Sequence, residues 1–126
     1  MEDDPFDRSS AVRYNNKIIS GRIKDFYKFS EKYPIVEYPI DPLEKMCIIC
    51  AYRKIIKTED EHEERINKAD LSYPILVAVE GDELFAIIDG NHRIAKAVRL
   101  NHKTIKTRLL PLEDLYNYFK HDTSTS

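Results

Sequence analysis

The sequence predicts a mixed α/β fold (α+β), a compact domain in which packed helices cover a small mixed sheet that includes a β-hairpin. Two apolar runs within residues 73–88 are separated by Gly81-Asp82, a signal typical of a hairpin with a tight turn. Apolar residues recur at helical spacing in residues 91–100 and again in residues 112–119. The hairpin residues are almost continuously apolar, which indicates a sheet with both faces covered by helices.

The other elements follow from local signals along the chain. Residues 33–40 predict a short edge strand because prolines interrupt an apolar run. Asp41-Pro42 then predicts a helix, with Asp41 as N-cap, that runs to about Lys57. Residues 13–30 are ambiguous between a hairpin around Ser20-Gly21 and a helix over about 22–30, which is the interpretation we favour. A helix from Asn91 to about Asn101, a strand over 103–109 and a helix over 112–119 complete the order strand, helix, hairpin, helix, strand, helix.

Composition limits the class of protein. The chain has 126 residues, of which 42% are apolar and 33% charged, so we expect a single globular domain over residues 13–120 with flexible tails at 1–12 and 121–126. No apolar run approaches the roughly 18 residues that cross a bilayer, which predicts no membrane partner. The acidic segment Met1–Pro5 does not resemble a secretory signal, so we expect a cytoplasmic location.

The two cysteines, Cys47 and Cys50, form a Cys-x-x-Cys, a spacing also found in redox and zinc sites. They lie in a segment with apolar residues at helical spacing, and the histidines are scattered singly along the chain. We therefore expect buried structural cysteines and no metal site, because a zinc site needs a second pair of ligands.

The candidate site is the junction between the hairpin and the next helix, residues 87–97. Gly90 would let the backbone pass close to a ligand, and the first amides of the helix would face an anion. Asp89 supplies a carboxylate beside the turn, and Asn91 a short polar side chain. The basic or polar groups able to meet phosphate are His92, Arg93 and Lys96. Ordinary turn and capping roles for Asp89, Asn91 and His92 are the alternative.

Charge is unevenly distributed. Residues 59–64 form an acidic run, expected to be a solvated loop or helix end. No acidic residue occurs between Gly90 and Pro111, whereas six basic residues do: Arg93, Lys96, Arg99, Lys103, Lys106 and Arg108. Such a set suits a polyanion, either a nucleotide or a nucleic acid, although a solvated helix face and a lysine-protected strand edge would give the same pattern.

Residues 34–112 resemble the ParB N-terminal and sulfiredoxin superfamily. The resemblance is carried by Asp89-Gly90-Asn91-His92-Arg93 after the apolar hairpin and supported by Ile35–Glu37, Asp41–Glu44 and Pro74–Val77. It implies a compact ParB/sulfiredoxin-like fold. Sulfiredoxins carry a catalytic cysteine where this chain has Asn91, so reduction of cysteine sulfinic acid is not expected. ParB proteins that bind cytidine triphosphate carry Gly-Glu-Arg-Arg at this turn, which Gly90–Arg93 does not match.

The free serine kinases of this fold are the most similar in chemistry, since they carry Asp-Gly-His-His-Arg and a Pro-x-Glu. Asp89 and Glu44 match their catalytic acidic positions, whereas Asn91 replaces the first histidine. The resemblance implies that residues 90–93 hold nucleotide phosphates while His92 and Arg93 neutralise charge. It also implies that Glu44 is a base or orients an acceptor hydroxyl, and that Asp89 orients that acceptor or Mg²⁺.

Three hypotheses follow for function. The first is a nucleotide-binding protein, a small kinase or nucleotide hydrolase that uses ATP, ADP or CTP with Mg²⁺, in which Glu44, Asp89 and His92 are catalytic and Gly90, Asn91, His92, Arg93 and Lys96 bind the nucleotide. The second is a ParB-like nucleic-acid-binding or nuclease module that uses the six basic residues. The third is a non-catalytic member of the fold that binds a protein partner.

Overall fold

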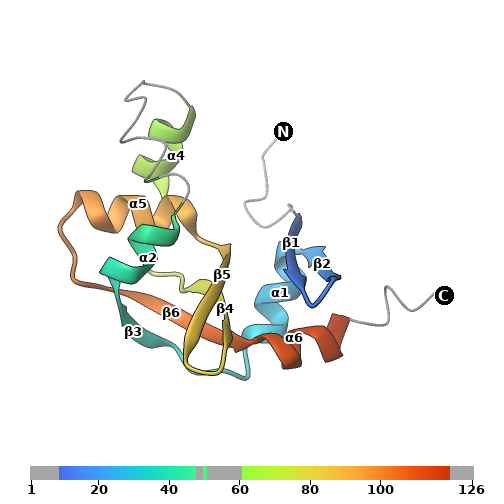
Figure 1. Ribbon diagram of the computed structural model, residues 1–126. Coiled ribbons are helices and arrows are strands. Elements are labelled where there is room, and N and C mark those ends of the chain that lie inside the picture. Colours follow the sequence, from blue (N-terminus) through green and yellow to red (C-terminus); the bar gives the residue numbers. More distant parts are fainter. Residues whose placement is uncertain (1–8, 48–49, 51–60, 120–126) are drawn as a thin grey trace. The chain divides into compact units, whose positions relative to one another are not determined.

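The computed structural model describes residues 9–47, 50 and 61–119 of the chain (Figure 1). Its helices and strands confirm the mixed α/β class. The chain separates into two compact units. Unit 1 comprises residues 1–34, 76–89 and 109–126, and unit 2 comprises residues 35–75 and 90–108. The hydrogen-bonded order of the strands is β3-β6-β4-β5 in one sheet and β1-β2 in the other.

Unit 1 begins with a β-hairpin. Strand β1 (Ser9–Tyr14) pairs antiparallel with β2 (Lys17–Arg22), and Asn15 and Asn16 turn the chain at φ 52° and 66°. Asparagine tolerates this left-handed conformation, which suits a two-residue hairpin turn. The hairpin therefore turns at Asn15-Asn16 and not at Ser20-Gly21, and helix α1 (Ile23–Ser30) follows it directly, as expected. Residues 9–12 belong to β1, which corrects our assignment of them to a tail, because Val12 packs into the core.

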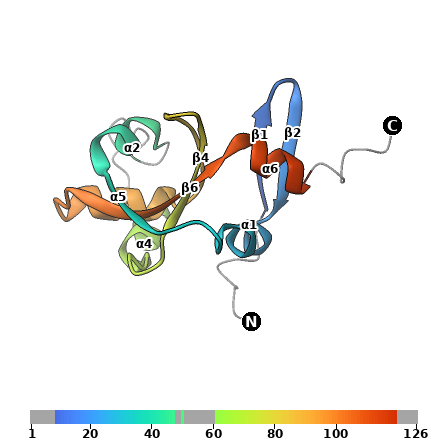
Figure 2. The same cartoon turned by 90° about the horizontal axis from the view of Figure 1, so that it is seen from below.

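The central hairpin and the final helix also belong to unit 1. Strand β4 (Ile75–Glu80) pairs antiparallel with β5 (Glu83–Asp89) around Gly81, whose φ is 63°. Helix α6 (Leu112–Phe119) follows strand β6 (Thr104–Pro111), whose last three residues lie in unit 1. These elements confirm the hairpin and the last helix that the sequence predicted. Figure 2 shows α6 beside the β1-β2 hairpin, and α6 is in contact with β2.

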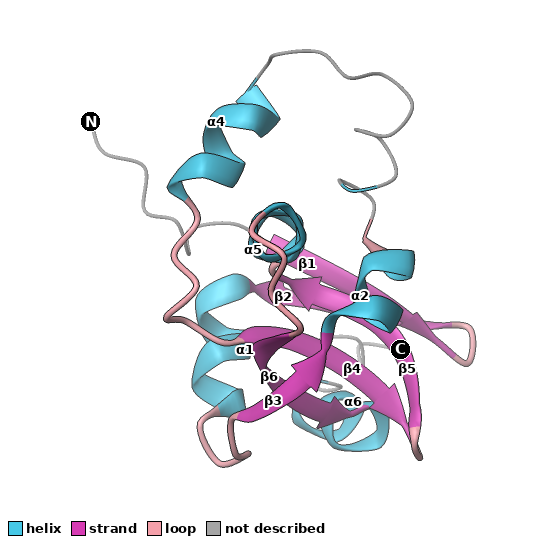
Figure 3. Ribbon diagram, turned by 90° about the vertical axis from the view of Figure 1, so that its left-hand side faces the viewer, coloured by secondary structure: helices cyan, strands magenta, loops and turns pink. Residues whose placement is uncertain are grey.

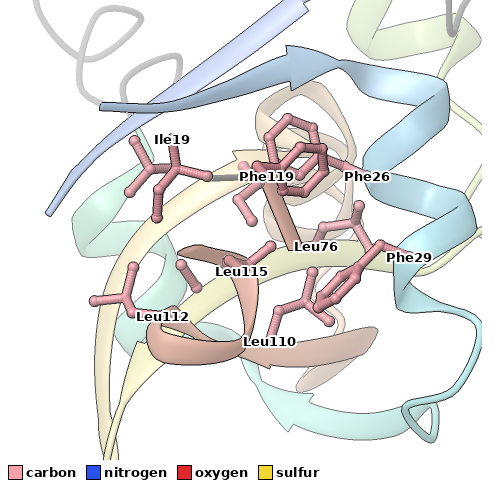
Figure 4. Packing of buried hydrophobic residues seen from close by; sticks show 11 residues of the cluster. Ile19, Phe26, Phe29, Leu76, Leu110, Leu112, Leu115 and Phe119 are labelled. Atoms are coloured by element: carbon pink, nitrogen blue, oxygen red, sulfur yellow. The ribbon is translucent and has the colours of Figure 1, made fainter. Parts of the chain in front are cut away.

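The core of unit 1 is rich in aromatic rings (Figure 4). Phe26 of α1 and Phe119 of α6 have ring centroids 4.5 Å apart, and Phe29 lies 6.1 Å from Phe119. The buried cluster consists of Val12, Ile19, Phe26, Phe29, Leu76, Ala78, Ile88, Leu110, Leu112, Leu115 and Phe119. At its edge the Tyr33 hydroxyl donates to Asp114 Oδ2 at 2.6 Å. Burial, with the hydrogen bond to Asp114 and its charge, raises the pKa of Tyr33 to about 12.

In unit 2, strand β3 (Val36–Pro39) pairs antiparallel with the first part of β6 and places Val36 opposite Thr107. Helix α2 (Ile40–Met46) follows at once, and Ile40 N donates to Lys103 O at 3.0 Å. The helix thus begins one residue before the predicted N-cap, Asp41, which lies in its first turn.

Helix α2 is shorter than predicted. It ends at Met46, and the backbone of the next residue, Cys47, is extended (φ −78°, ψ 113°), so the single helix that we expected to reach Lys57 is wrong. Cys50 is helical again, whereas residues 48–49 and 51–57 lie outside the described residues. The physical reason is local: the Cys47 side chain accepts a hydrogen bond from Cys50 N, and such contacts between side chain and backbone compete with a continuous helix.

Helix α5 (Asn91–Arg99) packs against two other helices of unit 2. It contacts both α2 and α4 (Glu61–Lys68), and Figure 3 shows it end-on between them. Ile94 of α5, Leu43 of α2 and Ile66 of α4 are each at most 1% exposed. Asn101 follows the helix at φ 61°, as a C-terminal signal should, which confirms the predicted end. The acidic run continues into α4, within which Glu64 pairs with Lys68 at 3.3 Å.

Candidate anion site at the start of helix α5

Helix α5 begins at a glycine. Gly90 is the N-cap residue at φ 123°, ψ 13°, and Ile94 N donates to Gly90 O at 2.9 Å to begin the helical hydrogen bonds. A Cβ atom at this position would lie 2.4 Å from Ile75 Cγ2, so both the conformation and the space require glycine. The first turn of α5 contains no acidic side chain. The positive end of this helix dipole is therefore not neutralised by a carboxylate of its own first turn.

Asn91 is the first residue of α5 and has two polar groups of interest. Its backbone carbonyl accepts a hydrogen bond from Cys47 Sγ at 3.4 Å. Its side-chain Oδ1 is buried and has no hydrogen-bond partner within the described part of the chain. Most buried polar atoms have such a partner. Asn91 Oδ1 thus resembles an acceptor for a donor that the described residues do not supply.

Asp89 is held by a tyrosine of unit 1. Its side chain is 5% exposed, and Tyr27 Oη donates to Asp89 Oδ2 at 2.8 Å. Ser10 Oγ also donates to the carbonyl of the preceding residue, Ile88, at 3.0 Å. These contacts fix the end of β5. Asp89 therefore has a structural role in the described chain, and Tyr27 is a partner that no spacing in the sequence revealed.

Arg93 and Lys96 donate from α5 to backbone carbonyls at the end of α4 and in the chain after it. Arg93 Nη1 donates to Pro74 O at 2.7 Å and to Tyr73 O at 3.2 Å. Lys96 Nζ donates to Asn67 O at 2.9 Å and to Ala69 O at 2.8 Å. The last carbonyls of a helix lack intrahelical donors and carry the negative end of its dipole, so a lysine there is favourable. Arg93 and Lys96, two of the predicted phosphate ligands, thus have partners inside unit 2.

The segment after α4 contains an aspartate, Asp70, whose pKa is lowered by its surroundings. Hydrogen bonds from the side chain and the backbone of Ser72 lower the pKa of Asp70, and the charges of Lys96 and Arg93 lower it further. Ser72 Oγ lies 2.6 Å from Asp70 Oδ1. A third cation of α5, Arg99, donates to Asn67 Oδ1 at 2.9 Å. The cationic face of α5 is therefore arranged around residues 67–74.

The remaining basic residues follow α5 on strand β6 or just before it. Lys103 and Lys106 are exposed, and Lys106 is opposite Glu37 of β3. Arg108 is half-buried. The six cations of this region consequently do not act alike. Arg93, Lys96 and Arg99 donate to groups of residues 67–74, whereas Lys103 and Lys106 are exposed.

Glu44 and His92 are the other two predicted catalytic residues. Both are half-buried in unit 2, Glu44 on α2 and His92 in the first turn of α5. The two helices are in contact, and the Cys47 Sγ contact to Asn91 O joins the end of α2 to the start of α5. Glu44 is the fifth residue of α2, so it lies beyond the first turn of that helix. Glu44 and residues 90–96 belong to unit 2, on two helices that are in contact.

Cys47 and Cys50 are 1% and 7% exposed and form no disulfide, which confirms their predicted burial. Among the residues with described positions, no three His, Cys, Asp or Glu side chains form a group that could hold a metal ion. No helix in the described ranges is long and apolar enough to cross a membrane.

Comparisons with protein-family models, with curated proteins and with solved structures find no significant match. The resemblance to the ParB and sulfiredoxin superfamily therefore stays a prediction from the motif at residues 89–93.

Proposed function

We propose that this chain binds the phosphates of a nucleotide at the start of helix α5. The observation that carries the proposal is the combination of a glycine N-cap with a first turn that has no acidic side chain. A helix start of this kind offers backbone amides and a positive dipole to an anion. Asn91 Oδ1 adds a buried acceptor that could take a donor from the sugar or the base.

The roles differ from those that the sequence suggested. Arg93 and Lys96 donate hydrogen bonds to backbone carbonyls within residues 67–74. We therefore assign them the role of positioning helix α5. Asp89 fixes the end of β5 through Tyr27. His92, in the first turn of α5, is the side chain that we assign to charge neutralisation beside the phosphates.

The reaction that we propose is phosphoryl transfer, in a small kinase or nucleotide hydrolase. Phosphoryl transfer depends mainly on positioning and charge stabilisation, so few side chains are required. Glu44 is the carboxylate of unit 2 that we assign to orient an acceptor hydroxyl or water, since α2 contacts α5. Mg²⁺ commonly binds through one or two carboxylates together with substrate phosphates, so this assignment needs no separate metal cage.

A nucleic-acid interface is the weaker alternative. Three of the six cations that suggested it donate to groups within unit 2, as described above. We therefore make no second proposal from the basic residues.

The test is the melting temperature of the whole chain with millimolar ATP, ADP, CTP or GTP, with and without Mg²⁺. A ligand at 100 times its Kd stabilises the folded state by about 2.7 kcal/mol. We expect His92→Gln to weaken the shift. His102→Gln is the matched control, because His102 is exposed beyond the other end of α5. If none of the four nucleotides raises the melting temperature, the proposal is wrong.

A further inference from the structure

The Cys-x-x-Cys has a geometry that burial alone does not require. Cys47 directly follows helix α2, and Cys50 is helical three residues later. Cys50 N donates to Cys47 Sγ at 3.3 Å. An N-cap side chain makes the same kind of contact with the amide three residues later. Cys47 thus follows the end of α2 and, through its side chain, accepts a hydrogen bond from the amide of helical Cys50.

The same contact brings the two side chains within reach of each other. The Cβ of Cys50 is two covalent bonds from the nitrogen that touches Cys47 Sγ, and a rotation about one further bond moves its Sγ. A disulfide requires two cysteines whose Cβ atoms lie about 3.5–4.5 Å apart. We propose that Cys47 and Cys50 are a reversible redox pair, and that formation of their disulfide alters the start of helix α5.

The link to α5 is the second contact of Cys47. Its thiol donates to the carbonyl oxygen of Asn91, the first residue of α5. A disulfide sulfur carries no hydrogen, so oxidation removes this donor and rotates Cys47 Sγ toward Cys50. The effect on exchange at the start of α5 is independent of the proposed function. A change in nucleotide affinity on oxidation is expected only where the proposed function also holds.

The reaction needs a small disulfide oxidant such as oxidised glutathione. Cys50, the more exposed of the two, gives up its proton and attacks one sulfur of the oxidant, which releases one glutathione thiolate. Cys47 then loses its proton, attacks the Cys50 sulfur of the mixed disulfide and releases the second. The two protein thiols lose two electrons and two protons in total, and the oxidant is reduced to two thiols. Reduced glutathione reverses both steps.

The first experiment measures the disulfide itself. The full chain is equilibrated with oxidised and reduced glutathione, quenched with acid and alkylated, and its intact mass is measured by mass spectrometry. Denatured protein is the control for the oxidant. We expect the folded chain to lose both alkylatable thiols without a glutathione adduct, whereas Cys50→Ala and Cys47→Ala retain one reactive or glutathione-bound cysteine. Two alkylated thiols, or a stable glutathione adduct on the folded wild-type chain, would overturn the proposal.

The second experiment measures the consequence at α5. We expect several-fold faster hydrogen exchange for the amides of residues 91–95 in the oxidised chain than in the reduced one. Cys47→Ala should resemble the oxidised chain because it lacks the S–H donor, and Cys47→Ser, which keeps an O–H, should resemble the reduced chain. Equal exchange in both redox forms overturns the coupling, and Cys50→Ala supplies a reference that retains the Cys47 donor. If the disulfide and the exchange difference occur but no nucleotide binds, only the proposed function fails.

Discussion

Replacement of Gly90 by alanine should destabilise the protein severely, and the structure allows the loss to be divided into two parts. Gly90 has φ 123°, a conformation that costs a residue with a Cβ about 1–3 kcal/mol. The new Cβ would also lie 2.4 Å from Ile75 Cγ2 and 2.6 Å from Ile75 Cβ. Such overpacking costs a further ~1–3 kcal/mol. The expected loss of about 2–6 kcal/mol is large against a typical total stability of about 5–15 kcal/mol.

Gly81→Ala is the matched control. Gly81 also has a positive φ, 63°, but nothing lies within 4 Å of the Cβ that the substitution would add. The substitution should therefore cost only the left-handed conformation, about 1–2 kcal/mol. The difference between the two variants measures the clash with Ile75.

The assay is denaturant unfolding of both variants, with Ile75→Ala added to each background. Because alanine at position 75 keeps the Cβ that lies 2.6 Å from the new atom, Ile75→Ala should not relieve the Gly90→Ala strain fully. If Gly90→Ala and Gly81→Ala lose the same stability, or if Ile75→Ala restores Gly90→Ala completely, the packing described here at the start of α5 is wrong.

Three further predictions concern the contacts around the candidate site and the core. Tyr27→Phe should cost about 1.5–3 kcal/mol of unfolding free energy by removing the hydrogen bond to buried Asp89, whereas Tyr118→Phe, at a side chain 46% exposed, should cost less than about 0.5 kcal/mol. Equal losses in denaturant unfolding would contradict the buried contact. Lys96→Gln should speed hydrogen exchange in α4 more than in α1, because Lys96 Nζ donates to the carbonyls of Asn67, at the end of α4, and Ala69, just after it. Unchanged exchange together with weakened nucleotide binding would instead make Lys96 a phosphate ligand. Tyr33 should ionise near pH 12 in a phenolate absorbance titration. Because its pKa is raised from 10.0, its stabilising effect is complete below pH 10 and is lost as the pH rises to 12, and Tyr33→Phe should remove that part of the pH dependence.

Elements with strong local signals were predictable from the sequence. The hairpin of residues 75–89 has a glycine turn between two apolar runs, and α5 and α6 have clear apolar periodicity, so local rules sufficed. The strand at Ser9–Tyr14 was missed because only one of its residues, Val12, is buried and its polar composition resembles a tail. The break at Cys47 was missed because hydrophobic periodicity continues through it, and only the side-chain contact to Cys50 N reveals it.

The candidate site was predictable in position but not in the partners of its side chains. A glycine between a strand and a helix with basic residues is visible in the sequence, and the structure places Gly90 at the N-cap of α5. The sequence does not show that Arg93 reaches Pro74, that Lys96 reaches Asn67, or that Tyr27 reaches Asp89, because these contacts join positions 19 or more residues apart. Residue type alone therefore overstated how many of these groups are available for a ligand.

The division of the chain has a consequence for the order in which it folds. Unit 1 consists of three segments and unit 2 of two, so the chain passes from one unit to the other four times. The core of unit 1 joins Phe26 to Phe119, so this unit cannot close during synthesis until α6 has left the ribosome. The residues of unit 2, 35–75 and 90–108, are all synthesised before α6. A ribosome stalled before residue 112 would thus present the start of α5 on a chain whose aromatic core still lacks its last helix, and any C-terminal truncation that removes α6 should expose Phe26 and Phe29 to chaperones.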